Sequence, residues 1–125
     1  MKKKIIISAT LFLTVLVFTK CYYDKADQVY PQPRNCDTTN IRLSVELNSI
    51  LSANCFACHS GTAESGSGIQ LDQYAVIKTY ADNGQLMSAI TQDGKVSPMP
   101  KNASRLSDCD INKFAAWINN GAPGN

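Results

Sequence analysis

The sequence contains very little histidine: a single residue, His59, among 125. One imidazole excludes every site that needs two, including an acid–base histidine beside a histidine metal ligand. A tetrahedral zinc site, which draws four ligands from cysteine, histidine and carboxylate side chains, is hard to assemble around one histidine and cysteines that lie far apart in the sequence. Any chemistry at His59 must therefore use other residue types.

The chain also lacks internal repeats and, apart from a few residues near 40–43, any convincing alternation of apolar and polar positions. Half-buried strands show that alternation, whereas a spacing of three and four residues indicates helices. The helical spacing recurs throughout residues 36–125. We therefore predict a single all-α domain over that range.

Long apolar runs are scarce as well, and the one that exists is residues 5–18, directly after three lysines. A basic start followed by roughly a dozen apolar residues is typical of an export signal and is too short for a permanent transmembrane helix. We assign residues 1–20 as a signal peptide. Its removal leaves eight basic residues against ten acidic ones. No basic cluster remains, so nucleic acid is not an expected partner.

Cys21 stands where a bacterial lipoprotein signal places its lipidated cysteine, although Lys20 replaces the small residue usual before it. Residues 21–35 are polar, contain prolines and have no helical or strand period, which is typical of a tether. We predict an exported protein of the periplasm or cell envelope, held at a membrane by a lipid on Cys21. Ordinary cleavage and release into the periplasm is the alternative.

Cys36 and Cys109 lie near the two ends of the predicted domain. Exported proteins rarely keep free thiols, so we predict a disulfide between them rather than two free cysteines. Closing a loop of this length restrains the unfolded chain by about 4 kcal/mol in the loop-entropy model.

About four short helices are expected. The first covers residues 45–54 with Ser44 as its cap, and the second covers 73–82 with Asp72 as its cap and ends at Asn83–Gly84. A third fits residues 85–91. The last is capped by Ser107 or Asp108 and runs to about residue 120, with a buried stripe of Ile111, Phe114, Ala115 and Ile118 and with Trp117 beside it. Helices this short need a packing surface, which a bound apolar cofactor would supply.

Cys55-Phe56-Ala57-Cys58-His59 has the spacing of a c-type haem attachment site. Two thiols three residues apart project to the same side over one helical turn, so each can add to one haem vinyl group. The histidine that follows is carried beneath the iron as an axial ligand. A thioredoxin-like redox pair would need a preceding strand in a βαβ unit, and neither is visible in the sequence.

The other axial position has two candidates in the mature chain, Met99 and Met87. Met99 lies between Pro98 and Pro100 in a segment without helical period, where the prolines fix the backbone at little entropic cost. Met87 falls inside the third predicted helix, where a core role is the ordinary one. We assign Met99 as the sixth ligand, and an open or water-bound iron is the other possibility.

Four segments, ILSANCFACHS (50–60), GIQLDQYAVIKTYADNGQL (68–86), SPMP (97–100) and WINNGAP (117–123), resemble the small cytochrome c domains of Bacteroidetes lipoproteins and the related planctomycete-type cytochromes. The resemblance covers nearly the whole mature domain, and CFACH and MP are its specific elements. It implies a class I-like cytochrome c fold whose first and last helices cross near the haem edge. It also implies His/Met ligation and electron transfer in the cell envelope.

The sequence thus predicts a monohaem one-electron carrier that is not an enzyme and that docks transiently with redox proteins of the envelope. Cys55 and Cys58 would hold one haem c covalently, with His59 and Met99 as iron ligands. The alternative function is a haem-based gas sensor with an open or weakly held sixth site, which requires that Met99 does not bind the iron.

Overall fold

The structure is a computed structural model that describes residues 36–125. The predicted signal peptide, the tether and the lipidation site at Cys21 lie outside the described residues. Within residues 36–125 the chain is all-α, as expected, and contains no strand, including near 40–43. No helix in this part of the chain is long and apolar enough to cross a membrane.

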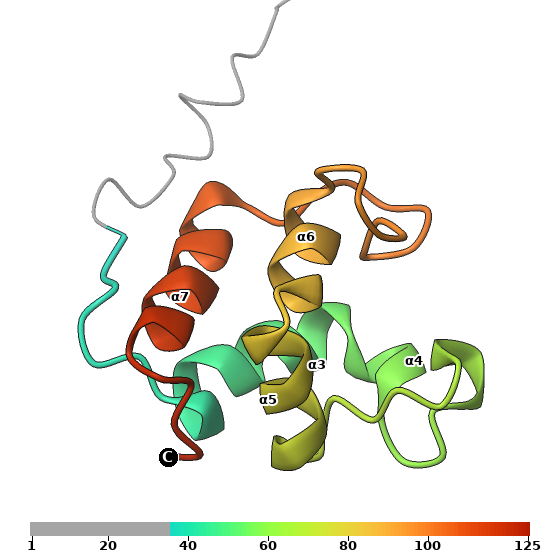
Figure 1. Cartoon of the computed structure of the whole chain (residues 1–125), viewed down its shortest axis with the longest axis horizontal. Coiled ribbons are helices and arrows are strands. Elements are labelled where there is room, and N and C mark those ends of the chain that lie inside the picture. Colours follow the sequence, from blue (N-terminus) through green and yellow to red (C-terminus); the bar gives the residue numbers. More distant parts are fainter. Residues whose placement is uncertain (1–35) are drawn as a thin grey trace, which may run out of the picture. The chain divides into compact units, whose positions relative to one another are not determined.

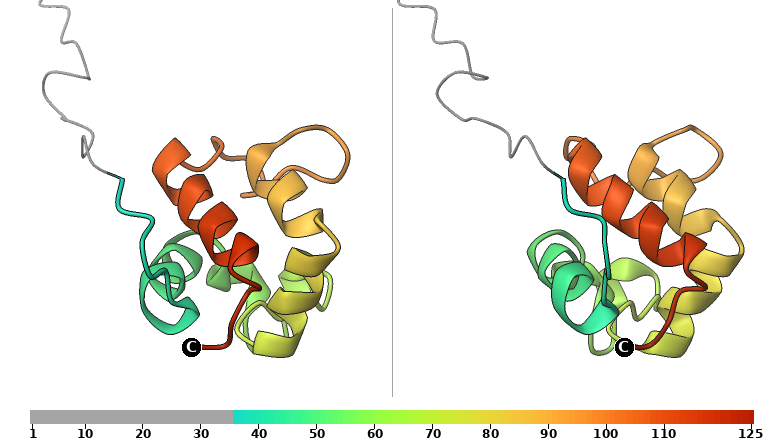
Figure 2. Two further views of the ribbon diagram at one scale, coloured as in Figure 1. Left: turned by 60° about the vertical axis from the view of Figure 1, so that its left-hand side comes forward. Right: turned by 90° about the vertical axis from the view of Figure 1, so that its left-hand side faces the viewer.

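The described chain contains five α-helices and two irregular helical turns. In order these are the π-helical turn η1 (Leu43–Leu47), α3 (Asn48–Asn54), α4 (Phe56–His59), the 3-10 turn η2 (Glu64–Gly66), α5 (Tyr74–Asp82), α6 (Gln85–Thr91) and α7 (Asp108–Asn119). Helix α7 packs against α6 and against η1, and α5 packs against α6 (Figures 1 and 2). A long connection, residues 92–107, links α6 to α7.

The core forms where α7 meets the other helices. Its largest fully buried side chains are Leu47, Leu51, Ile77, Phe114 and Trp117. Trp117 also donates from Nε1 to the carbonyl of Pro123 at 2.9 Å, so its polar atom is satisfied inside the core. Removing these five side chains from water supplies much of the stabilisation that short helices lack on their own.

The buried stripe of α7 differs from the prediction in one respect. Trp117, which was expected beside the stripe, belongs to the buried face and has no exposed surface, whereas Ala115 and Ile118 are half-buried. The predicted stripe followed the three- and four-residue spacing of apolar positions. In the structure the buried face of α7 includes Trp117, because burial of its large indole removes the most area from water.

Several helix boundaries confirm the sequence pattern. Helix α6 has the predicted bounds, and α5 ends at Asn83 and Gly84, with Gly84 at φ +78°. Ser107 caps α7, since its Oγ accepts from the backbone N–H of Asp110 at 3.1 Å. A side-chain acceptor at this position satisfies one of the helix's unpaired donors.

Two predicted caps are wrong. Ser44 lies inside η1, whose flanking residue is Arg42. The Glu46 carboxylate accepts two hydrogen bonds from Arg42, one from the backbone N–H at 2.9 Å and one from the guanidinium at 2.8 Å. Because these bonds tie Glu46 to Arg42, the helical segment begins directly after Arg42 and includes Ser44. Asp72 does not cap α5, because its Oδ2 accepts from the backbone N–H of Gly61 at 3.1 Å.

Cys36 and Cys109 are paired, as the sequence predicted. Their sulfurs lie 2.15 Å apart and their Cα atoms 5.4 Å apart, inside the usual range for a disulfide. The bond joins the start of the described chain to the first turn of α7. The remaining cysteines of this part of the chain, Cys55 and Cys58, are free thiols.

Candidate functional site

A cavity of about 500 Å³ contains every haem-site residue named from the sequence except Met87. It lies between the segment 55–69, helices α5 and α6, and the connection 92–107. A volume of this size is typical of a small-molecule or cofactor site. Its apolar lining comprises Ile69, Leu71, Leu86, Ala89, Ile90, Val96 and Pro100.

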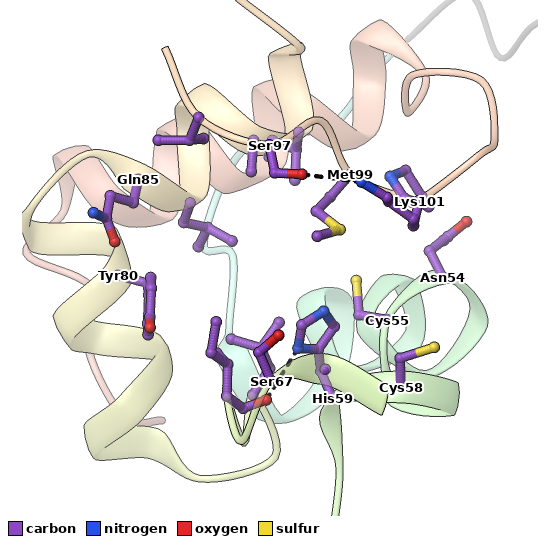
Figure 3. Close-up of a pocket in the computed structure, with 18 of the residues that line it drawn as sticks. Asn54, Cys55, Cys58, His59, Ser67, Tyr80, Gln85, Ser97, Met99 and Lys101 are labelled. Atoms are coloured by element: carbon purple, nitrogen blue, oxygen red, sulfur yellow. Dashed lines mark hydrogen bonds between the residues drawn. The ribbon is translucent and has the colours of Figure 1, made fainter. Parts of the chain in front are cut away.

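The two thiols enter the cavity from one local turn. Cys55 ends α3, where its backbone leaves the helical region at φ −125°, and the short helix α4 follows. The N–H groups of Cys58 and His59 both bond the carbonyl of Cys55, at 3.1 and 2.9 Å. This turn keeps the two sulfurs and the imidazole on one local element of the cavity wall, and Figure 3 shows them at the cavity edge.

His59 is buried and its ring is fixed by a backbone contact. Nδ1 lies 3.0 Å from the carbonyl oxygen of Ile69. Because a carbonyl oxygen only accepts, Nδ1 carries the proton and Nε2 is left with a free lone pair. Outer-shell hydrogen bonds of this kind orient metal-ligating histidines and raise their basicity. The described chain therefore presents a preoriented nitrogen donor.

Gly66 permits the close approach behind His59. A Cβ built on Gly66 would lie 2.5 Å from His59 Nδ1, and nearer still to the carbonyl oxygen of Cys58. Neither distance is compatible with a real side chain, so only glycine fits at this position. The loop can thus fold tightly enough for Ile69 to reach the ring.

Met99 enters the cavity from the connection 92–107. Its backbone N–H donates to the carbonyl of Ala89 at 3.0 Å, and its carbonyl accepts from Gln92 Nε2 at 3.3 Å. In Figure 3 the thioether of Met99 points toward the His59 ring across the cavity. Met87, the other candidate, packs at the edge of the hydrophobic core and lines a separate shallow cavity beside α6.

The donor set and lining fit a covalently bound haem. One imidazole with a free lone pair, one thioether, two thiols and an apolar wall are the groups that such a cofactor requires. Any bound group would be anchored by Cys55 and Cys58 and ligated by His59 and Met99. All four side chains line this cavity.

The two competing interpretations of the cysteine pair find less support. Burial raises the pKa of the Cys55 thiol to about 11, whereas redox-active pairs depend on a lowered thiol pKa. The absence of strands from residues 36–125 also removes the βαβ context. For zinc, the described residues contain no group of three or more histidine, cysteine or acidic side chains placed to hold an ion.

Several residues that build the site were missed from the sequence. Gly66, Ile69, Ala89 and Gln92 act through backbone groups or close contacts and carry no motif of their own. The position of Gly66 in the loop after the CxxCH segment was the one available signal, since glycines there permit close approach.

Comparison with known proteins does not assign the chain: no protein-family model matches it, and neither a curated protein nor a solved structure matches it.

Proposed function

We propose that this protein is a monohaem c-type cytochrome that carries single electrons in the bacterial cell envelope, with a class I-like cytochrome c fold. One observation carries the proposal. An imidazole from residues 55–59 and a thioether forty residues later line the same apolar cavity as two thiols spaced for haem attachment.

The chain's own residues would each have a defined task. Cys55 and Cys58 would form thioether bonds, which keep the cofactor attached when an iron ligand dissociates. His59, oriented by the Ile69 carbonyl, would supply the permanent nitrogen ligand. The Met99 sulfur would occupy the opposite side and exclude small molecules. When bound, the haem supplies an iron centre that gains and loses one electron, and a thioether ligand raises its potential.

This arrangement supports a carrier rather than an enzyme. If His59 and Met99 both bound the iron, no coordination site would be left for a substrate. Peroxide chemistry usually recruits a second histidine as acid–base, and the sequence has only His59. Membrane attachment through Cys21 and transient docking with redox proteins of the envelope belong to the same proposal.

Production of the full chain in a host that carries cytochrome c maturation machinery tests the proposal. We expect a red protein whose haem stain survives denaturing electrophoresis, and a reduced-minus-oxidised spectrum typical of a six-coordinate c-type haem. The Cys55→Ala/Cys58→Ala variant is the matched control and should lose the stain on the denaturing gel. A colourless wild-type protein from a competent host would contradict the proposal.

A further inference from the structure

The cavity has two chemically different ends. In Figure 3 the thiols of Cys55 and Cys58 lie at one end, and Tyr80 and Gln85 lie at the other, with the His59 ring and the Met99 sulfur between them. Tyr80 comes from the last turns of α5 and Gln85 from the first turn of α6. Two polar side chains from consecutive helices therefore line the end of the cavity opposite the thiol pair.

The Tyr80 hydroxyl and the side-chain amide of Gln85 have no partner among the hydrogen bonds of residues 36–125, whereas the Gln85 backbone N–H donates to Asn83 Oδ1 at 2.9 Å. By contrast, the Asn54 amide at the thiol end donates to the Ile50 carbonyl at 2.9 Å, and Lys101 donates to Ser97 at 3.3 Å. Tyr80 is half-buried, and apolar residues such as Leu86 line the wall around it. Gln85 is exposed at the rim of the cavity. A hydroxyl and an amide at the rim of an apolar cavity are donors available to a ligand.

The two edges of haem differ chemically in the same way as the two ends of the cavity. The two vinyl groups of haem, which the cysteine thiols consume, stand on one edge of the macrocycle, and its two propionate carboxylates stand on the opposite edge. If the vinyl edge were fixed at Cys55 and Cys58, the carboxylates would lie toward the other end of the cavity. Carboxylates only accept hydrogen bonds, and the hydroxyl of Tyr80 and the amide of Gln85 both donate.

We propose that Tyr80 and Gln85 bind the haem propionates and so fix the orientation of the cofactor, an inference that rests on the proposed function. The two donors are neutral, so they stabilise the carboxylates through charge-assisted hydrogen bonds and not through ion pairs. Lys101 lies beside Met99 in Figure 3, and its ammonium donates to Ser97 Oγ at 3.3 Å, away from Tyr80 and Gln85.

The experiment compares haem with its dimethyl ester, in which both carboxylates are blocked. In the Cys55→Ala/Cys58→Ala background, apoprotein is titrated with each pigment. Tyr80→Phe and Gln85→Leu should each weaken haem binding by about tenfold, the lower part of the range for a hydrogen bond to a charged group, and leave binding of the ester unchanged. Tyr74→Phe is the matched control on α5, since its hydroxyl bonds the Ala122 carbonyl. Equal weakening for both pigments, or none for either, would overturn the proposal.

A second measurement uses the covalent holoprotein and does not depend on folding of the cysteine-free variant. Tyr80→Phe should lower the reduction potential, because a propionate without its donor holds more negative charge near the iron and stabilises the ferric state. Tyr74→Phe should leave the potential unchanged. A Tyr80→Phe potential equal to wild type in a fully haem-loaded protein overturns the propionate assignment alone, whereas a colourless wild-type protein overturns the proposed function as well.

Discussion

The two walls that face each other across the cavity are held in different ways. The His59 wall, residues 55–69, fixes its ligand by a hydrogen bond to the donor ring itself, from Nδ1 to the Ile69 carbonyl at 3.0 Å. On the Met99 arm, residues 92–107, the ligand residue is held through its own backbone: the Met99 N–H donates to the Ala89 carbonyl, and the Met99 carbonyl accepts from Gln92 Nε2. A thioether accepts hydrogen bonds weakly, so its rotamer depends on packing. This difference predicts that His59 stays bound to the haem iron, whereas Met99 can be displaced from it.

Removing the ligand of the His59 wall should have the largest effect. Without its imidazole, His59→Ala has no nitrogen donor to hold the iron while the thioether bonds form. We expect the haem content of purified protein to fall by more than about tenfold, since even a lost outer-shell partner of a metal ligand costs about 10- to 100-fold. Haem staining and absorbance per protein measure it. Met99→Ala is the comparison variant and should retain its haem. Equal haem content in His59→Ala and Met99→Ala would contradict the prediction that His59 matters more than Met99 for haem attachment.

Removing the ligand of the Met99 arm should change the redox properties and leave the haem attached. Met99→Ala should lower the reduction potential by more than about 60 mV, a tenfold change in a one-electron equilibrium, because the thioether favours the ferrous state. The ferrous variant should also bind carbon monoxide rapidly.

Met87→Ala is the matched control, since that side chain packs at the edge of the core and lines only the cavity beside α6. An unchanged potential and spectrum in Met99→Ala would show that Met99 is not a ligand. Rapid carbon monoxide binding by untreated wild-type protein would favour the gas sensor over the carrier.

The local motifs were predictable from the sequence because their chemistry lies within one turn. The helical turn at residues 55–59, the cap at Ser107 and the bounds of α6 all depend on residues a few positions apart. The paired cysteines at 36 and 109 were also predictable, because exported chains rarely leave thiols free.

The contacts that orient the ligands were not predictable, because each depends on tertiary structure. The acceptor for His59 is a backbone carbonyl ten residues away, and any residue type would supply it. The anchor of Met99 at Ala89 likewise requires the connection 92–107 to fold back on α6. Asp72 was misassigned for the same reason: its partner Gly61 lies in a loop whose path no local pattern specifies.

A smaller change to the His59 wall tests whether ring orientation matters separately from ligand identity. Gly66→Ala places a Cβ 2.5 Å from His59 Nδ1, so the ring or the loop must move. We expect the free energy of unfolding to fall by about 1–3 kcal/mol, the usual cost of overpacking, together with a changed haem spectrum. Thermal unfolding and absorbance measure both effects.

Gly61→Ala separates the clash from backbone strain. Gly61 has φ +59° and open space around its Cα, so alanine there is strained without touching the ring. This variant should lose stability and keep the wild-type spectrum. If Gly66→Ala also keeps the wild-type spectrum, close approach behind His59 does not set the ring orientation.

Lowering the pH should destabilise the Met99 arm, because it protonates the Asp93 carboxylate. This carboxylate accepts from the Ser88 hydroxyl and from the Lys95 backbone N–H, and it pairs with the Lys95 ammonium at 3.0 Å. These contacts lower the pKa of Asp93 to about 2. A carboxyl whose folded-state pKa is depressed stabilises the protein above its unfolded pKa of about 3.9, and this contribution is lost as the pH falls toward 2. Asp93→Asn should therefore melt below wild type at pH 6 and approach it near pH 2; parallel melting curves at all pH values would contradict this role.

The smallest effect is expected from loosening the backbone anchor of Met99 without touching its sulfur. Gln92 Nε2 bonds the carbonyls of Met99 at 3.3 Å and Ala103 at 3.5 Å, so its side chain bridges two points of the arm. Both contacts are long, and Gln92→Leu should cost at most about 0.5–1.5 kcal/mol, the net value of an ordinary hydrogen bond. Because the sulfur stays in place, the potential should remain near wild type while carbon monoxide displaces Met99 several-fold faster, by stopped-flow absorbance. A displacement rate unchanged in Gln92→Leu would mean that packing around the thioether, and not the bridge behind it, limits its release.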